Sequence, residues 1–404
     1  MARRLPDDPI IRRLVQQAQA ARLSRRAMLL GAGGLATAAT LAACSTGTGG
    51  SSKPTAAADV SDTDKTLKWS NWPAYLDQDD DGNYTTLEAF EAQSGITVTY
   101  TEDIDDNSSY YAKVRDQLAL GQDIGADLVC LTDWMVNRWI TLGYTQELDH
   151  DNIPNIANLV SDLENPDFDP GRVYSLPWQG GFAGLCWNVE KVPNGLQSID
   201  DLWDSSLKGK VGVLSEMRDT IGLLMLSQGV DISGDFTDEQ FENAIDLFTE
   251  KVEDGQIRNV KGNAYLEDLQ NEDTLAAIVW SGDISVLNAE VGEEKWKFVI
   301  PDSGGTIWND NFMVPIGSGH KANAEELMNY YYDPEVAAQV AAWVNYITPV
   351  EGAQEAMESI DADLATDDLI FPSEDMLAQV KRFRSLTTSE ESKYQAAFQA
   401  VLLG

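Results

Sequence analysis

Short apolar runs alternate with longer amphipathic segments through most of this chain. The runs with a strand-like pattern lie at residues 66–70, 96–100, 127–131, 209–214, 275–280 and 297–301. Segments with a helical spacing of apolar residues lie between them, at 86–95, 110–121, 237–255 and 335–345. This alternation predicts an α/β fold in which mostly parallel sheets are flanked by helices. The 340 residues from Lys65 onward are enough for two lobes rather than one core.

The residues that follow these strands are the first place to look for a binding site. In open α/β sheets, ligands collect beyond the carboxyl ends of the strands. Aromatic and acidic residues are frequent there and in nearby loops. The candidates are Trp72, Tyr75, Asp133, Trp134, Glu216, Asp219, Trp280, Trp308, Asp310 and Tyr346.

The stretch GGTIWNDNF, residues 304–312, combines an aromatic residue with an acid. If it forms a strand, Trp308 and Asp310 share one face, because side chains two apart point the same way. A hydrophobic core accommodates the tryptophan but not the aspartate. Aromatic faces and carboxylates together form a cage for an organic cation, in which rings pack on methylene groups and acids bind the ammonium ends.

Glu216 and Asp219 form a second acidic feature. Ser215 is predicted to cap a helix that runs to about Gln228, so both acids lie in or near its first turn. The helix dipole favours ionised carboxylates there, and a spacing of three residues can bring them to one side. The alternative is that they only complement the dipole while Arg218 pairs with one of them.

The first 64 residues predict export and membrane attachment. Residues 24–29, SRRAML, resemble a twin-arginine export signal, and a short apolar run then leads to the lipobox Leu41-Ala42-Ala43-Cys44. We therefore expect a signal peptide at 1–43, lipidation at Cys44, and a lipoprotein on the outer face of the cytoplasmic membrane. Small polar residues from 44 to 64 predict a flexible tether.

Composition narrows the function. The formal net charge is −38, and the leader carries seven of the arginines, so the exported chain is more negative still. That charge argues against nucleic-acid binding. The chain has only two histidines and no hydrolase, zinc-protease or phosphate-loop motif, although paired carboxylates with aromatics also describe glycosidases. Cys130 and Cys186 lie in apolar runs and are either buried thiols or a disulfide.

Several stretches resemble the spermidine/putrescine-binding proteins of bacterial ABC importers, within the type II periplasmic-binding-protein superfamily. They are KWSNWPAY, ADLVCLTDWMV, YSLPWQGGFAGLCWN, LKGKVGVLSEMRDTIG, LAAIVWSGD, GGTIWNDNFMVPIGS, DPEVAAQVAAWVNYITP and LIFP, in that order along the chain. The resemblance implies a monomeric, non-enzymatic receptor that needs no cofactor and delivers a polyamine to an ABC permease. It implies hinge crossover strands between lobe 1, residues 65–180 and 309–352, and lobe 2, residues 181–308 and 353–404.

The same resemblance assigns roles to individual residues. Glu216 and Asp219 fall on the family's acid pair for a terminal ammonium, and Asp310 on the acid that meets an amine along the ligand. The aromatic cage corresponds to Trp72, Tyr75, Trp134, Trp280, Trp308 and Tyr346. Pro73, the exchanged order of Glu and Asp, and Phe383 in place of a glutamine depart from the family pattern, so the preferred amine stays open. A receptor for a sugar or another organic cation, or a glycosidase, is the alternative.

The stretch DQDDDGNYTTLE, residues 77–88, matches the calcium loop of EF-hands. Its predicted ligands are Asp77, Asp79, Asp81, Asn83, Thr85 and Glu88, with Gly82 at the sharp turn. The alternative is an acidic, solvated turn. A calcium ion here would have a structural role, fixing the loop that presents Trp72 and Tyr75.

Overall fold

The computed structural model describes residues 53–403. The predicted signal peptide, the lipidated Cys44 and the first part of the tether lie outside the described residues. Within residues 53–403, no helix is both long enough and apolar enough to cross a membrane.

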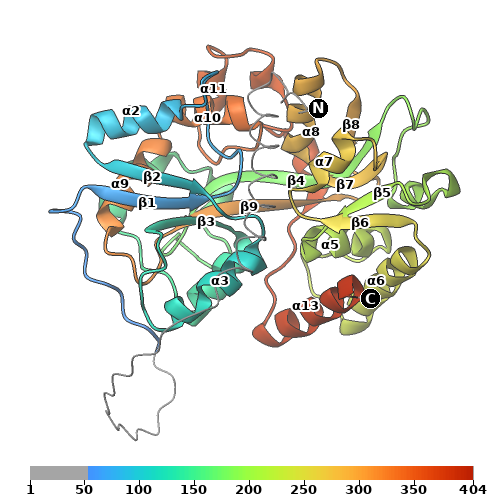
Figure 1. Ribbon diagram of the computed structural model, residues 1–404, viewed down its shortest axis with the longest axis horizontal. Helices are drawn as coiled ribbons and strands as arrows, with labels where there is room; N and C mark the ends of the chain where they lie inside the picture. The colour runs from blue at the N-terminus through green and yellow to red at the C-terminus, as the bar shows by residue number, and fades with distance from the viewer. Residues whose placement is uncertain (1–52, 404) are drawn as a thin grey trace, which may run out of the picture.

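One continuous sheet runs through both lobes, as Figure 1 shows. Its main strand order is β2-β1-β3-β9-β4-β7-β5-β6, with β10 paired to β9 and β8 to β4. Pairs within each lobe, such as β1 with β2 and β5 with β6, are parallel, whereas β9 runs antiparallel to β3 and β4, and β4 runs antiparallel to β7 and β8. The strands are β1 Thr66–Asn71, β2 Thr97–Glu102, β3 Leu128–Thr132, β4 Leu176–Asn188, β5 Val211–Leu214, β6 Ile257–Lys261, β7 Ala276–Trp280, β8 Trp296–Val299, β9 Gly305–Met313 and β10 Val380–Lys381.

Lobe 1 packs helices on both faces of β1, β2 and β3. A large core that includes Trp69, Phe90 and Tyr331 lies on one face, and a smaller one that includes Tyr110 and Trp139 lies on the other. The helices of this lobe are α2 Thr85–Ser94, α3 Asn107–Ala119, α4 Asp133–Leu142, α9 Lys321–Tyr331, α10 Pro334–Val344 and α11 Ala353–Met357, with short 3-10 helices η1 His150–Asn152, η2 Pro154–Asn158, η3 Ser161–Leu163 and η6 Leu364–Thr366.

Lobe 2 is built in the same way around β5, β6 and β7. Its core gathers Phe241 and Phe248 of α6 with Tyr394 and Phe398 of α13. Tyr394 stacks on Phe241 with ring centroids 3.9 Å apart, which fixes the C-terminal helix to the lobe. The helices are α5 Met217–Ser227, α6 Asp238–Glu253, α7 Tyr265–Gln270, α8 Ser281–Val291, α12 Glu374–Leu377 and α13 Thr388–Leu403, with η4 Ile199–Trp203 and η5 Ser205–Leu207.

The long strands β4 and β9 pass from one lobe into the other. They pair with each other from Leu176 to Ala183 and from Phe312 to Thr306, so the predicted crossover strands lie side by side at the centre of the sheet. Because β9 also pairs with β3 of lobe 1 and β4 with β7 of lobe 2, the two crossing strands connect the sheet of one lobe to that of the other.

Two predicted boundaries are wrong. Residues 353–371 were assigned to lobe 2, but Ala353, Met357 and Ile370 are buried in the core of lobe 1. The chain reaches lobe 2 only afterwards, where Phe383 joins the other core. The cap of α5 is Glu216 rather than Ser215, and the Glu216 side chain accepts from the Arg218 N–H.

Part of the predicted tether is fixed to lobe 1. The N–H groups of Ala57 and Val60 donate to the carbonyls of Ile316 and Gly319. Asp59 accepts from Ala322 N at the start of α9. Residues 53–64 thus belong to the folded body rather than to a flexible linker.

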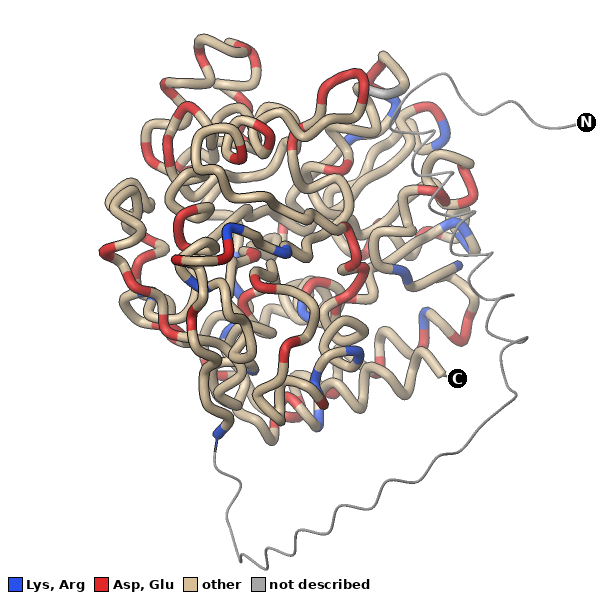
Figure 2. Tube along the Cα trace, turned by 60° about the vertical axis from the view of Figure 1, so that its left-hand side comes forward, with Lys and Arg blue, Asp and Glu red and all other residues tan. Residues whose placement is uncertain are grey.

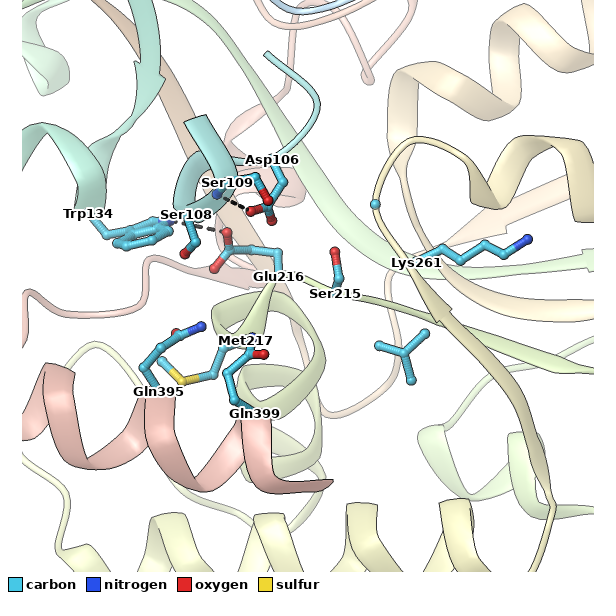
Figure 3. Close-up of a pocket in the computed structure, with 12 residues that line it drawn as sticks. Asp106, Ser108, Ser109, Trp134, Ser215, Glu216, Met217, Lys261, Gln395 and Gln399 are labelled. Atoms are coloured by element: carbon cyan, nitrogen blue, oxygen red, sulfur yellow. Dashed lines mark hydrogen bonds between the residues drawn. The ribbon is translucent and has the colours of Figure 1, made fainter. Parts of the chain in front are cut away.

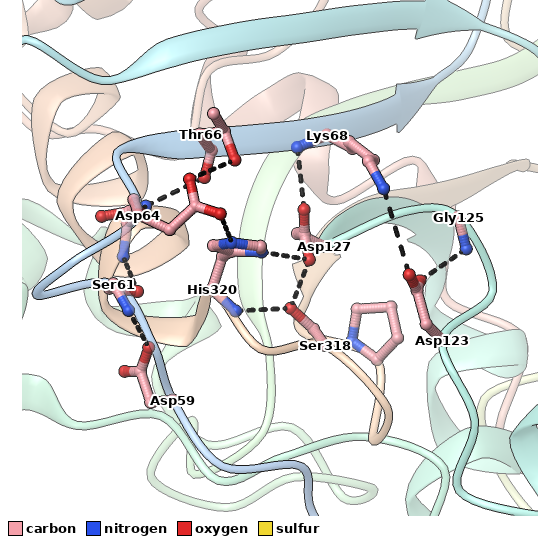
Figure 4. Close-up of polar contacts among 12 residues, drawn as sticks. Asp59, Ser61, Asp64, Thr66, Lys68, Asp123, Gly125, Asp127, Ser318 and His320 are labelled. Atoms are coloured by element: carbon pink, nitrogen blue, oxygen red, sulfur yellow. Dashed lines mark hydrogen bonds and ion pairs between the residues drawn. The ribbon is translucent and has the colours of Figure 1, made fainter.

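His320 lies at the end of this docked segment, between two carboxylates, as Figure 4 shows. Its Nδ1 is 3.0 Å from Asp127 Oδ1 and its Nε2 is 3.3 Å from Asp64 Oδ2. Asp127 also accepts from Ser318 Oγ and from the Lys68 N–H. Burial lowers the pKa of His320, but its bonds to Asp127 and Asp64 outweigh that effect and raise the pKa above its ordinary value.

Charge is spread over the surface rather than concentrated. Figure 2 shows acidic residues throughout the visible trace with far fewer basic ones among them.

Cys130 on β3 and Cys186 on β4 are both buried free thiols, so they do not form a disulfide.

We predict that attachment of residues 53–64 to lobe 1 weakens as pH rises. Charged His320 stabilises the docked form fully below its unfolded pKa, and this contribution is lost as pH rises through the higher folded pKa. Hydrogen exchange at Ser61 and Asn323, corrected for the intrinsic rate, should therefore show less protection at pH 8 than at pH 6. His320→Gln should remove the dependence, while His150→Gln should retain it; an equal loss in both variants would contradict the prediction.

Candidate ligand-binding site

A continuous path of aromatic rings crosses the boundary between the lobes. It runs through Tyr265, Trp280, Trp308, Tyr346 and Tyr75, with successive ring centroids 5.9, 6.4, 5.3 and 5.9 Å apart. Every contact is edge-to-face, so some ring faces are left for other groups. Four of the six predicted cage aromatics therefore come together, joined by Tyr265, which the sequence analysis missed.

Asp310 lies at the Tyr75 end of this path. Its Oδ2 accepts from Tyr75 Oη at 2.9 Å and its Oδ1 from Thr132 Oγ1 at 2.6 Å. The predicted strand is present as β9, and Trp308 and Asp310 are two residues apart on it. The side chains of both therefore lie on the same face of the sheet, as expected.

Asp219 lies beside Trp280. Its Oδ2 accepts from Trp280 Nε1 at 2.8 Å and its Oδ1 from Thr306 Oγ1 at 2.6 Å. The residue is buried in the first turn of α5, after the carboxyl end of β5. Position and burial both agree with the expectation for a strand-end acid.

Asp283 is a third acid of the site, which the sequence analysis did not identify. It lies in the first turn of α8, directly after β7, and accepts from Tyr265 Oη at 2.5 Å and from Tyr346 Oη at 3.0 Å. The signal was present in the stretch LAAIVWSGD, because Asp283 follows the strand-end Trp280 by three residues.

Two glycines allow the rings to lie directly on the backbone. A Cβ atom at Gly181, which pairs with Trp308 across β4 and β9, would come within 2.7 Å of the Trp308 ring and 2.8 Å of Tyr346. A Cβ atom at Gly282 would meet the Tyr346 ring at 2.9 Å. No side chain larger than hydrogen fits at either position without moving these rings.

Two acids of the site, Asp219 and Asp310, are buried, and Asp283 is half-buried. Among the described residues, Asp219, Asp283 and Asp310 form no ion pair with any lysine, arginine or histidine. Burial raises the pKa of Asp310 to about 7 and that of Asp283 to about 6, even though hydroxyl donors act in the opposite direction. Burial also raises the pKa of Asp219. A cation placed among these groups would restore their ionised forms.

Trp134 does not join the aromatic path. The guanidinium groups of Arg218 and Arg138 lie over its ring, with Cζ 4.5 and 5.0 Å from the centroid. Both arginines bind Glu391 of α13. The Trp134 ring, which was expected to pack on a ligand, therefore contacts two arginines of the protein itself. Its Nε1 donates to Glu216 Oε2 at 3.2 Å.

Glu216 and Asp219 point to different surroundings, so their spacing does not bring the carboxylates together. Glu216 contacts Trp134 and lies 4.0 Å from Arg218 Nη1, whereas Asp219 contacts Trp280 and Thr306. Burial raises the pKa of Glu216 to about 8 against the opposing effect of Arg218. The sequence analysis offered the alternative that Arg218 pairs with one of these two acids, and that acid is Glu216.

A cavity of about 330 Å³ opens beside Glu216, as Figure 3 shows. It lies between the start of α3 in lobe 1 and the β5–α5 junction and α13 in lobe 2. Asp106 and Ser109 contribute from one side, Gln395 and Gln399 from the other. The cavity therefore opens at the boundary between the lobes, on the Glu216 side of the site.

Two other strand-end candidates lie near the path but are differently engaged. Trp72 is half-buried and packs against both cores of lobe 1. Asp133 forms an ion pair with Arg382 and accepts from Asn311 Nδ2 at 2.8 Å. The charge of Asp133 is therefore already balanced by Arg382.

The predicted calcium loop adopts part of the expected form. Gly82 has a φ of 83°, and Glu88 lies in the first turn of α2. However, Asp77 is buried and accepts from Thr86 N, and Asp79 accepts from the N–H of Asn83. Across residues 53–403, no three carboxylate, imidazole or thiol groups are gathered to hold a metal ion. Calcium binding would require these carboxylates to exchange their present hydrogen bonds for the ion.

Comparison with known proteins places the chain in a family. Residues 85–371 match the bacterial extracellular solute-binding proteins, and this segment includes every residue of the aromatic path except Tyr75. The chain belongs to this family. Solute-binding proteins are not enzymes, so membership of the family agrees with the predicted non-enzymatic receptor, which needs no cofactor. It also agrees with the predicted export.

Relatives and solved structures agree with this assignment. The solute-binding protein is 28% identical over 315 residues to the spermidine/putrescine-binding periplasmic protein of Escherichia coli K12, covering 77% of this chain and 84% of that protein. It is 27% identical to the putrescine-binding periplasmic protein PotF of the same organism, covering 78% of this chain and 85% of PotF. A putative spermidine/putrescine ABC transporter structure from Listeria monocytogenes shares the fold, with a TM-score of 0.73, 24% identity, and coverage of 84% and 99% of the two chains.

Glu391 links the lobes of the solute-binding protein at the edge of the site. Arg138 on α4 of lobe 1 donates from Nη2 to Glu391 Oε1 at 2.8 Å, and Arg218 on α5 of lobe 2 binds the other oxygen. The Glu391 side chain is only 13% exposed. Solvent therefore screens this bridge less than it would an exposed ion pair.

We predict that Glu391→Gln favours separation of the lobes. Loss of the charge should weaken the bridge by roughly 1 kcal/mol, about a fivefold change in the ratio of closed to open molecules. Small-angle scattering of the ligand-free protein should then give a larger radius of gyration. Glu390→Gln is the matched control, because the neighbouring Glu390 pairs with Arg384 inside lobe 2. An identical scattering curve for both variants would rule out an interlobe role for Glu391.

Proposed function

We propose that this protein is a lipid-anchored receptor that captures a polyamine of the putrescine/spermidine class between its lobes and delivers it to an ABC permease. The polyamine would lie along the aromatic path. Its ammonium groups would meet Asp219, Asp283 and Asp310, and its methylene groups would pack on Trp280, Trp308 and Tyr346.

One observation carries this proposal: three carboxylates, buried at Asp219 and Asp310 and half-buried at Asp283, lie along one path of aromatic rings and form no ion pair with any cation among residues 53–403. Buried acids are ordinarily paired, because an unpaired buried charge is costly. The hydroxyl and indole donors on Asp219, Asp283 and Asp310 stabilise their charge only in part, since the pKa of each stays raised. A ligand with two or more positive charges on a flexible apolar chain supplies what is missing.

The relatives support the same ligand class. The two Escherichia coli proteins described above are named for binding spermidine or putrescine, and the alignments cover more than three quarters of this chain. A sugar would leave the three acids without counter-charges. The three departures from the family pattern keep the choice among the amines open.

The leader and tether support the proposed anchoring. Lipidation at Cys44 would leave residues 45–52 as the connection between the membrane and the docked segment at residues 53–64. Eight residues span at most about 28 Å when fully extended. We take the receptor to act as a monomer, and this short connection would hold it close to the membrane that contains its permease.

We predict that spermidine and putrescine raise the melting temperature in a thermal-shift panel, while sugars have no effect. Asp310→Asn should weaken polyamine binding by about 1.5 to 3 kcal/mol, the scale of a hydrogen bond to a charged group. Isothermal titration calorimetry measures this loss. Asp246→Asn removes the same charge from an exposed position on α6 and should leave the affinity unchanged. Stabilisation by sugars alone would refute the polyamine assignment, and unchanged affinity in Asp310→Asn would remove Asp310 from the site.

We also infer calcium binding at residues 77–88 from the sequence pattern, with ordering of the Trp72–Tyr75 loop as its effect. Calorimetry with calcium at millimolar concentration should show binding that Asp79→Ala and Glu88→Ala each abolish. Asp80→Ala is the control, because this exposed acid lies in the same loop but outside the ligand positions. Absence of binding to the wild-type protein would refute the inference without bearing on the polyamine site.

A further inference from the structure

Gln179 lies next to Asp310 but is not among the residues proposed above to bind the polyamine. In the central sheet, Asp310 of β9 pairs with Thr132 of β3 on one side and with Gln179 of β4 on the other. Side chains of directly paired residues lie on the same face of a sheet, about 5 Å apart at their Cβ atoms. Thr132, Asp310 and Gln179 therefore form a row across three strands.

The neighbouring glycine identifies the face on which this row lies. Gly181 is two residues beyond Gln179 on β4, so both point to the same side of the strand. A Cβ atom at Gly181 would collide with Trp308 and Tyr346, whereas one at Gly180 would meet the side chain of Asn309. The Gln179 side chain thus leaves the sheet on the side of the aromatic path.

The buried Gln179 side chain has a carbonyl oxygen without a hydrogen-bond donor among residues 53–403. The residue is 2% exposed, and no donor among the described residues reaches its Oε1 atom. Most other buried polar atoms without partners in this part of the chain are donors, chiefly indole N–H groups. A buried carbonyl oxygen without a donor is uncommon in proteins and calls for an explanation.

The neighbours of Gln179 in the row cannot supply the missing donor. Thr132 uses its hydroxyl hydrogen on Asp310 and accepts from Asn107 Nδ2. Tyr75 donates its hydroxyl hydrogen to the other oxygen of Asp310. Asp310 brings only acceptors when it is ionised. An N–H group of a ligand that enters the site would supply this donor.

We propose that Gln179 is a specificity-determining residue, whose Oε1 accepts an N–H from the same ligand nitrogen that Asp310 binds. This role rests on the proposed polyamine function. Asp310 supplies the charge, and Gln179 supplies a neutral acceptor that only an ammonium with at least two N–H groups can use together with it. Protonated primary and secondary amines meet this requirement, while quaternary ammonium groups of equal charge do not.

The role of Gln179 differs from that of the aromatic rings. Ring faces attract any organic cation, including quaternary ones. Carboxylates likewise respond to charge whether or not the nitrogen carries hydrogen. A buried amide oxygen stays unpaired beside a quaternary nitrogen, and a site with an unpaired polar group discriminates strongly against such a ligand.

The test compares putrescine with its bis-quaternary counterpart, in which methyl groups replace every N–H. Calorimetry on Gln179→Met, which keeps the length of the side chain but has no strong acceptor, should show putrescine binding weakened about tenfold or more. Affinity for the bis-quaternary compound should change less than about twofold, because it makes no bond to Gln179. Gln179→Glu, which keeps an acceptor, should bind putrescine at least as well as Gln179→Met binds it.

The outcomes separate this inference from the proposed function. Equal weakening of both ligands in Gln179→Met would show a packing role and overturn the inference, as would unchanged putrescine binding. If the wild-type protein binds neither putrescine nor spermidine, the proposed function fails first, and the inference falls with it. Circular dichroism melting of each variant shows whether the fold is intact.

Discussion

The burial of negative charge at the junction of the lobes is the constraint on which the rest of the site depends. Asp219, Asp283 and Asp310 each receive two hydrogen bonds from hydroxyl or indole groups, yet burial still raises the pKa of each. These donors stabilise the site, because no acid is left without partners. They do not replace a counter-charge, so the site retains a strong electrostatic preference for cations.

The crossing strands explain how one site can belong to both lobes. Asp310 is positioned by β9, which pairs with β3 of lobe 1, while Asp219 and Asp283 begin helices of lobe 2. A cation between them attracts groups from both sides, so its binding energy also favours contact between the lobes. Gly181 has a part in this arrangement, because its missing side chain lets Trp308 and Tyr346 cover the strands on which the lobes meet.

The parts of the site that follow from local geometry could be predicted from the sequence. The shared face of Trp308 and Asp310 follows from the two-residue period of a strand, and the location of Asp219 from the end of β5. Contacts between distant segments could not be predicted. The spacing of four residues on α4 brings Arg138 to Trp134, but no local pattern places Arg218 over that ring, because α4 and α5 belong to different lobes. The return of residues 353–371 to lobe 1, and the docking of residues 53–64, likewise depend on tertiary packing.

Glu216 connects the charge of the site to the contact between the lobes. It caps α5 in lobe 2, accepts from Trp134 of lobe 1, and lies near Arg218, which also binds Glu391. Burial raises its pKa to about 8. When the lobes separate, the carboxylate gains water and its ordinary pKa returns, which favours the ionised form. Closure around a cationic ligand therefore sets the desolvation of Glu216 against the attraction of the ligand. Under the proposed function, a ligand with more positive charge would offset more of that cost and would therefore favour the closed form.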